Sequence, residues 1–177
     1  KKKFDGMIIT GAPVERMDFD KVDYWDELCD IMDYARKNVF STLYICWGAF
    51  AGLNHHYNIP KYPLEKKLSG IFMNEQLTEN DPLLRGFDDT FPIPQSRHST
   101  IKKEDILAND DLIILANSPE AGVTIVKSKS NREIFMTGHL EYDTSTLSEE
   151  YWRDTNKGLK VPLPKNYYPN KVRYTSG

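Results

Sequence analysis

The stretch Ser41–Leu53, STLYICWGAFAGL, changes character at Cys46. The residues before the cysteine, Leu43–Ile45, are apolar or aromatic and predict a short buried strand. The residues after it, Gly48–Gly52, are mostly small and fit a tight turn that leads into a helix. Cys46 is therefore either a small buried core residue or a nucleophile held on the turn between a strand and a helix.

A nucleophile on such a turn has a physical purpose. The turn projects the sulfur above the carboxyl ends of the strands, and the following backbone N–H groups, near Trp47, can form an oxyanion hole. The start of a helix also favours thiolate, which can lower a cysteine pKa from about 8.5 to about 3.5–7.5. The turn alone leaves both interpretations of Cys46 open. Cys29 falls among helical core positions, and we predict that it is a core residue.

Strand and helix patterns alternate around this junction. Phe4–Thr10 predicts a buried strand, a charged loop follows, and segment 24–38 places apolar residues at helical spacing. With the strand Leu43–Ile45 and a helix over Gly48–Tyr57, the order β-loop-α-β-turn-α predicts a parallel sheet with covering helices. The elements predicted further along are strands and loops interrupted by Pro82, Pro92 and Pro94, three successive strands within 111–139, and a helix over Leu147–Lys157.

Length and composition are those of one globular domain. The chain has 177 residues, of which 40% are hydrophobic and 28% charged. A net charge of −3 does not favour a nucleic-acid surface, and no apolar run approaches the length of a membrane span, about 18 residues or more. Two cysteines are too few for a disulfide framework or a zinc site made of thiolates.

From this composition we expect a cytoplasmic protein with reduced thiols, no metal, and no nucleic-acid or membrane partner. We also expect residues 1–177 to form a single catalytic domain. Because the strand Phe4–Thr10 begins abruptly, we expect this domain to lack an N-terminal part.

A thiol nucleophile needs a base, and four histidines are available: His55, His56, His98 and His139. His139 ends a predicted strand, and in a parallel sheet that end lies at the same edge as the turn after Leu43–Ile45. Glu141, two residues on, can turn back and hold the imidazole tautomer. The sequence therefore predicts a Cys46-His139-Glu141 triad.

The elbow and the Gly-His-x-Glu motif resemble those of the class I glutamine amidotransferases. That resemblance implies a flavodoxin-like α/β three-layer sandwich with a mainly parallel sheet. The sequence is more similar still to the homoserine O-acyltransferases of methionine biosynthesis. The motifs that carry this resemblance are GAPVE, YWDEL, ICWGAFAGL, LLRGFDDTF, SRHS, SPEAG, TGHLEYD and YWRD, and they span most of residues 4–169.

The resemblance implies a role for each member of the triad. Cys46 corresponds to the acyl-thioester nucleophile, His139 to the general base and Glu141 to the group that orients it. Phe50, Leu140 and the tail after Asn170 depart from the family pattern, and none of them belongs to the triad.

The resemblance also implies the substrate contacts. Lys67 corresponds to a lysine of the acyl pocket, Ser96 to a substrate-binding serine, and Arg153 to the arginine that grips the homoserine carboxylate. Glu15, the last residue of GAPVE, corresponds to the position that separates acetyl from succinyl donors. Without the resemblance, these would be a solvated lysine, a turn serine, a solvated arginine and an exposed loop carboxylate.

The function implied is acyl transfer from acyl-CoA to L-homoserine, with acetyl-CoA as the donor because position 15 is Glu. Acyl-CoA would be a co-substrate, no cofactor is implied, and a homodimer is possible. Three alternatives stay open: a succinyltransferase, a glutaminase-type amidotransferase, and a catalytically silent binding domain in which Cys46 is a core residue.

Overall fold

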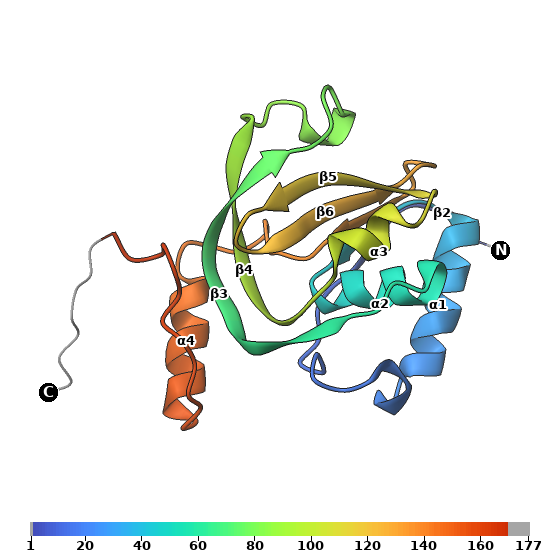
Figure 1. Ribbon diagram of the computed structural model, residues 1–177. Helices are drawn as coiled ribbons and strands as arrows, with labels where there is room; N and C mark the ends of the chain where they lie inside the picture. Colours follow the sequence, from blue (N-terminus) through green and yellow to red (C-terminus); the bar gives the residue numbers. More distant parts are fainter. Residues whose placement is uncertain (1, 170–177) are drawn as a thin grey trace, which may run out of the picture.

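The computed structural model of the chain describes residues 2–169 as one curled sheet with helices packed against it (Figure 1). The strands are β1 (Phe4–Ile9), β2 (Val39–Ile45), β3 (Tyr62–Gln76), β4 (Thr90–Thr100), β5 (Leu112–Ser118), β6 (Gly122–Ser128) and β7 (Glu133–Met136). The helices are α1 (Trp25–Asn38), α2 (Trp47–Tyr57), α3 (Lys103–Leu107) and α4 (Thr146–Asn156), with 3₁₀ turns η1 (Phe19–Lys21) and η2 (Pro82–Leu84).

The seven strands are ordered β1-β2-β7-β6-β5-β3-β4. β1 pairs with β2 and β2 with β7 in parallel, so Ile45 lies opposite Met136 at the carboxyl edge. The α/β class expected from the sequence is confirmed. The sheet itself is mixed, because the four strands β3–β6 form only antiparallel pairs. Short turns join β5 to β6 and β6 to β7, and a short turn can join only antiparallel neighbours.

The helices α1, α2 and α3 share one core with the sheet. Met32 of α1, Phe50 and Leu53 of α2, and Ile106 of α3 are buried with Tyr44 of β2 and Phe135 of β7. α2 packs unusually close to the end of β1, since a Cβ at Gly48 would lie 2.4 Å from the carbonyl oxygen of Ile9. The backbone at the start of α2 therefore contacts the backbone at the end of β1.

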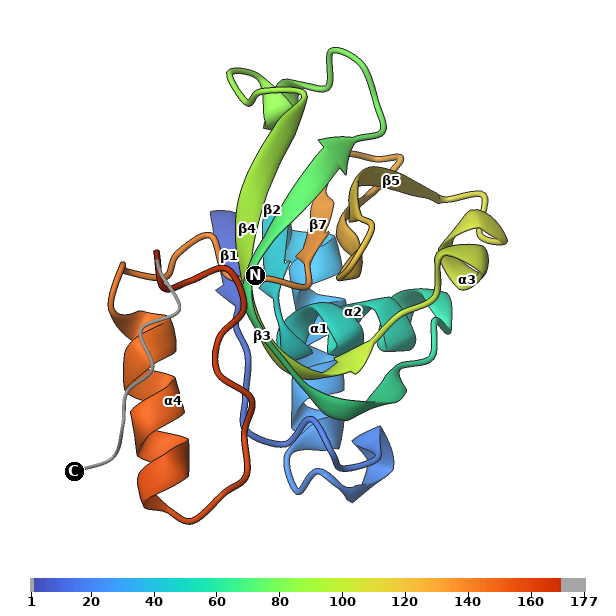
Figure 2. The ribbon, with the colours of Figure 1, turned by 60° about the vertical axis from the view of Figure 1, so that its left-hand side comes forward.

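The two long strands β3 and β4 form the other edge of the sheet. Pro92 and Pro94, interpreted from sequence as interruptions, lie within β4. A proline fits there because β4 is an edge strand and one side of it needs no ladder hydrogen bonds. The segment after α4 returns to β3, where Lys165 accepts from the N–H of Ile71 and donates its own N–H to Ser69 (Figure 2).

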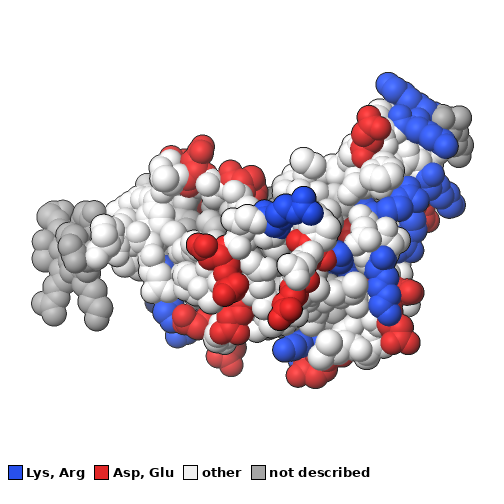
Figure 3. Space-filling model, turned by 90° about the horizontal axis from the view of Figure 1, so that it is seen from above, with Lys and Arg blue, Asp and Glu red and all other residues white. Residues whose placement is uncertain are grey.

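Acidic and basic side chains are interspersed over the face in Figure 3, with basic groups densest at its right-hand end. Within the described range, no helix combines the length and the apolar character needed to cross a membrane. The departure from the family pattern after Asn170 lies outside the described residues.

Candidate active site

Cys46 occupies a sharp turn between β2 and α2. Its backbone has φ 52° and ψ −119°, a region that non-glycine residues rarely adopt and that marks stored strain at functional turns. Its N–H donates to the carbonyl of Met136 at 2.8 Å, and its carbonyl accepts from Ala49 at 2.9 Å. The strand–turn–helix geometry predicted for STLYICWGAFAGL is therefore present.

The loop after β1 passes against this turn. A Cβ at Gly11 would lie 3.3 Å from the Cβ and 3.8 Å from the sulfur of Cys46, and 3.8 Å from the backbone nitrogen of Trp47. Sequence reasoning missed Gly11, whose only signal was its position directly after an apolar strand. Without a side chain at Gly11, space remains beside the sulfur and the Trp47 N–H. The Trp47 ring itself is buried in a small core with Val22 and Ala51.

The imidazole of His139 is held by its neighbours. Nδ1 lies 2.6 Å from Oε1 of Glu141, and the ring stacks on Tyr142 with centroids 4.1 Å apart. Nε2 is thus the nitrogen available for the sulfur. The hydrogen-bond contact of the Cys46 sulfur among the described residues is with the carbonyl of Ser96, at 3.8 Å, and resting sites often tighten only when substrate binds.

One cavity of about 530 Å³ brings the predicted side chains together. Its lining includes Glu15, Cys46, Lys67, Ser96, His139, Glu141 and Arg153, which come from loops, strands and α4. His98 of β4 also lines it, and its ring contacts Arg16. The two remaining histidines lie at the end of α2, outside this cavity.

Lys67 is not a solvated lysine. Its Nζ lies 3.0 Å from Asp154 and 3.6 Å from Glu150, both on α4. The hydroxyl of Ser96 donates to Glu150, which also accepts from the Tyr142 hydroxyl at 2.6 Å. Sequence reasoning missed these two acids. Their only signal is a spacing of four residues on a helix around Arg153, which places them on one helical face.

Arg153 lies on the exposed side of the same cluster. Its guanidinium donates to Asp154 from Nε at 2.9 Å, and a second nitrogen lies 2.8 Å from the same oxygen. The neighbouring carboxylate raises the pKa of Arg153, and Lys67 with Arg153 lowers the pKa of Asp154 against the effect of its burial.

Glu15 is fixed inside the cavity rather than exposed on a loop. Its carboxylate accepts the backbone N–H of His98 at 2.6 Å. Its carbonyl accepts from the Ser99 hydroxyl at 3.2 Å and from Lys61 Nζ at 2.8 Å. Burial raises the pKa of the Glu15 carboxyl, and the N–H of His98 and the charge of Arg97 oppose that rise.

The environment of the sulfur favours the thiol in the resting protein. Burial raises the pKa of Cys46 to about 12, and the charge of Glu15 adds to the rise. The backbone N–H of Trp47 and the charge of Arg97 act in the opposite direction. A thiolate here therefore requires proton transfer to a nearby base, and His139 lines the same cavity.

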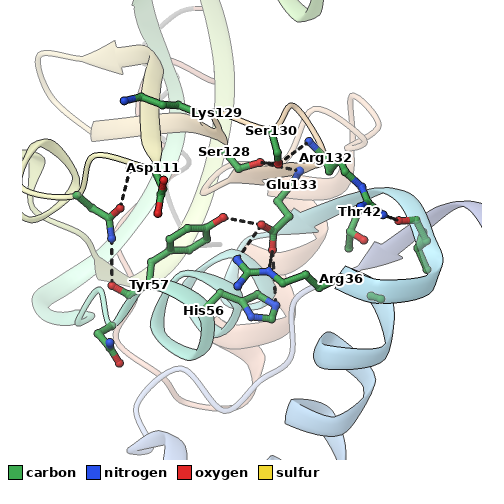
Figure 4. A pocket seen from close by; sticks show the side chains of 14 residues that line it. Arg36, Thr42, His56, Tyr57, Asp111, Ser128, Lys129, Ser130, Arg132 and Glu133 are labelled. Atoms are coloured by element: carbon green, nitrogen blue, oxygen red, sulfur yellow. Dashed lines mark hydrogen bonds and ion pairs between the residues drawn. The ribbon is translucent and has the colours of Figure 1, made fainter.

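A second cavity, of about 480 Å³, lies at the opposite edge of the sheet, where β7 begins (Figure 4). The buried carboxylate of Glu133 accepts from Arg36 at 2.9 Å and from the Tyr57 hydroxyl, and Nε2 of His56 lies 3.6 Å away. This network ties α1 and α2 to β7. It shares no lining residue with the cavity around Cys46.

The family model described as homoserine O-succinyltransferase matches residues 1–175. The chain belongs to the homoserine O-succinyltransferase family. Relatives named homoserine O-acetyltransferase include those of Methanomethylophilus alvi (59% identical), Petrotoga mobilis (55%) and Geobacillus kaustophilus (57%), each over 169 residues. These alignments cover 96% of this chain and 55–56% of each relative, so the chain spans about half their length.

The fold of this chain is similar to those of solved glutamine amidotransferases. A glutamine amidotransferase from Thermotoga maritima aligns over 85% of this chain and 64% of its own, with a TM-score of 0.69 and 14% identity. Another, from Methylobacillus flagellatus, covers 96% of this chain and 82% of its own, with a TM-score of 0.64 and 11% identity. At such identity the likeness concerns the fold alone.

Proposed function

We propose that this chain is the part of a homoserine O-acyltransferase that carries the reacting groups, and that acetyl-CoA is its acyl donor. The observation that carries the proposal is the single cavity in which a cysteine on a strained turn meets a histidine–glutamate pair, a lysine and an arginine. The names of relatives at 55–59% identity support the reaction. No resident cofactor is required, because acyl-CoA enters as a co-substrate.

The first half-reaction forms a thioester on Cys46. The thiol gives its proton to Nε2 of His139, and the thiolate attacks the carbonyl carbon of acyl-CoA. The N–H of Trp47, at the start of α2, stabilises the negative oxygen of the tetrahedral intermediate. The bond to the CoA sulfur then breaks, and CoA leaves with the proton held by His139.

The second half-reaction transfers the acyl group to homoserine. His139 removes the proton of the substrate hydroxyl, whose oxygen attacks the thioester carbonyl. Cys46 leaves as thiolate and is reprotonated by His139. General-base catalysis of this kind is typically worth about 10²–10⁴-fold in rate. Glu141 keeps the tautomer correct and stabilises the imidazolium in both halves.

The charged side chains at α4, which are Glu150, Arg153 and Asp154 with Lys67 beside them, suit the binding of an amino-acid zwitterion. A guanidinium such as that of Arg153 binds carboxylates in a bidentate way, and it stands at the exposed side of the cavity. Glu150, held by Ser96 and Tyr142, offers a negative charge to the substrate ammonium group. The hydroxyl end of homoserine would then point toward Cys46.

Glu15 favours a donor without a second charge. Its half-buried carboxylate lines the same cavity as the sulfur and is fixed by the N–H of His98. A succinyl group would bring another carboxylate into this space. Two negative charges 4 Å apart repel by about 4 kcal/mol at an effective dielectric constant of about 20, whereas an acetyl group meets no such repulsion.

The mass of the intact protein after incubation with each acyl-CoA tests the proposal. We expect an acetyl adduct on Cys46 with acetyl-CoA, discharged when L-homoserine is added. A Cys29→Ala variant should form the same adduct, and a Cys46→Ala variant should not. An adduct that homoserine does not discharge would contradict the transfer step.

The glutaminase alternative predicts a different result in the same assay. A glutaminase would form a glutamyl thioester with glutamine and release ammonia, and it would ignore acetyl-CoA. A silent binding domain would form neither adduct. These three outcomes are distinguishable by mass.

A further inference from the structure

Arg97 is a buried cation that the steps above do not use. It lies in β4 and is 0% exposed. Its guanidinium donates to three neutral acceptors: Oε1 of Gln95 at 2.9 Å, the carbonyl of Ser99 at 2.6 Å and the carbonyl of Ala121 at 2.5 Å. No carboxylate among residues 2–169 lies within ion-pair distance of it.

Such an arrangement is costly. A charge that leaves water is usually compensated by a carboxylate in direct contact, and three neutral hydrogen bonds only partly replace that partner. The other buried cation of this sheet, Lys127 of β6, follows the usual rule because it pairs with Asp81. The uncompensated charge of Arg97 must therefore be balanced over a longer distance.

The residues on either side of Arg97 touch two acidic groups of the active site. The carbonyl of Ser96 lies 3.8 Å from the sulfur of Cys46, and the N–H of His98 donates to the carboxylate of Glu15. Arg97 thus stands between the strand positions that contact these groups. Burial lowers the pKa of Arg97 to about 10, and Cys46 and Glu15 oppose that fall, so the guanidinium remains charged at neutral pH.

The other charges around the sulfur either oppose a thiolate or are engaged by a neighbouring side chain, as Arg16 is, exposed and 3.3 Å from the ring of His98. Glu15, from the loop after β1, and Glu141, from the loop after β7, both disfavour a thiolate. Lys67 and Arg153 already contact carboxylates of α4. The remaining titratable side chains that line the cavity are Arg16, His98, His139, Tyr142, Glu150 and Asp154.

We propose that Arg97 is a positioning residue that acts through its charge: it stabilises the thiolate of Cys46 and offsets the negative field of Glu15. When the thiol proton moves to Nε2 of His139, the new negative charge on sulfur is met by a cation that is already fixed and dry. Fixed charges of this kind need no reorganisation during the reaction. The inference rests on the proposed function only in taking Cys46 as the nucleophile.

The test measures the thiolate without any acyl donor. In a Cys29→Ala background, the rate of Cys46 alkylation by iodoacetamide is recorded from pH 6 to pH 10. Arg97→Gln removes the charge and keeps a hydrogen-bond donor, whereas Arg97→Lys keeps the charge and loses the fork. We expect Arg97→Gln to move the profile to higher pH and to slow alkylation at pH 7 at least tenfold. The profile of Arg97→Lys should stay near that of the parent.

Lys127→Met is the matched control, since it removes a buried cation outside the cavity. It should lower stability and leave the alkylation profile in place. An unmoved profile in folded Arg97→Gln, or equal shifts in Arg97→Gln and Arg97→Lys, would overturn the proposal. If Arg97→Gln does not fold, a shifted profile in Arg97→Lys overturns it and an unmoved one supports it. If acetyl-CoA does not acylate Cys46, the proposed function is contradicted, but the alkylation profiles of the Arg97 variants still test the role of Arg97.

Discussion

At the scale of single residues, the first prediction concerns the pair His139 and Glu141. His139→Asn should abolish most acyl transfer at every pH, because His98 is engaged by Arg16 and the other two histidines lie outside the cavity. Glu141→Ala should cost less, since stacking on Tyr142 still holds the ring. Steady-state rates across pH check both changes. An essential His98 with a dispensable His139 would contradict the assignment.

The second prediction concerns Glu15 and the choice of acyl donor. Glu15→Gly removes a half-buried carboxylate and leaves space in the cavity that Cys46 lines, so the preference for acetyl-CoA over succinyl-CoA should fall by at least tenfold. Competition between the two donors, read as the ratio of acyl adducts on Cys46, measures this directly. Glu120→Gly, on an exposed turn outside the cavity, is the control and should not change the ratio. A parent protein that prefers succinyl-CoA would refute the role given to Glu15.

At the scale of elements, α2 depends on its approach to β1. Gly48→Ala would place a methyl group 2.4 Å from the carbonyl oxygen of Ile9 and 2.8 Å from that of Thr10. Overpacking of this kind costs about 1–3 kcal/mol, and it would also displace the turn that carries Cys46. We expect a lower unfolding midpoint together with slower alkylation of Cys46.

The matched control is Gly6→Ala in β1, the strand whose end Gly48 approaches. A Cβ there would meet only the carbonyl oxygen of Ser41, at an ordinary 3.8 Å. This variant should keep both stability and reactivity. Equal losses in the two variants would show that the close approach at Gly48 is unimportant.

The network around Glu133 makes a prediction about element docking. Arg36→Met removes the cation of the buried carboxylate that joins α1 and α2 to β7. Leaving such a group without its partner costs about 1–3 kcal/mol. Lys21→Met, which removes an exposed ion pair with Asp20, should change stability by less than about 0.5 kcal/mol. Denaturant unfolding measures both variants, and alkylation of Cys46 should be normal in both.

How far the sequence could predict these elements depends on which contacts are local. The strand–Cys46–helix turn and the position of His139 follow from patterns of a few residues and from the parallel pairing of β2 with β7. The antiparallel pairing of β3–β6 does not follow from such patterns, because the alternation of apolar and polar residues along a strand does not encode the direction of its neighbour. Glu150 reaches the site because α4 lies beside β3. The segment after α4 holds it there, through the backbone hydrogen bonds of Lys165 to β3. Arg97 is a charged residue in a polar motif, and no local signal predicts its burial.

At the scale of the whole molecule, we predict a loss of stability in mild acid. Burial lowers the pKa of His56 to about 4 from an ordinary 6.5, so the folded chain keeps this ring neutral. Below pH 6.5 the unfolded chain binds a proton that the folded chain does not, and stability falls until about pH 4. The slope from one such group is at most about 1.4 kcal/mol per pH unit. Unfolding in urea from pH 7 to pH 4 measures this slope.

The control for this prediction is His56→Gln, which has no charge to gain. Its free energy of unfolding should depend less on pH in that window, whatever its value at pH 7. A slope identical to that of the parent would assign the acid sensitivity to other groups.

The order β1-β2-β7 also has a kinetic consequence. Cys46 and His139 meet across neighbouring strands, yet all of β3–β6 lies between them in the chain. Closing so long a loop is slow relative to forming local hairpins, so the pairing of β2 with β7 is expected late in folding. During synthesis the thiol leaves the ribosome well before its base, and it stays an ordinary cysteine until the last long-range pairing forms. The change in the alkylation rate of Cys46 after dilution from denaturant, from that of an exposed ordinary cysteine to that of the folded site, would therefore time that final step.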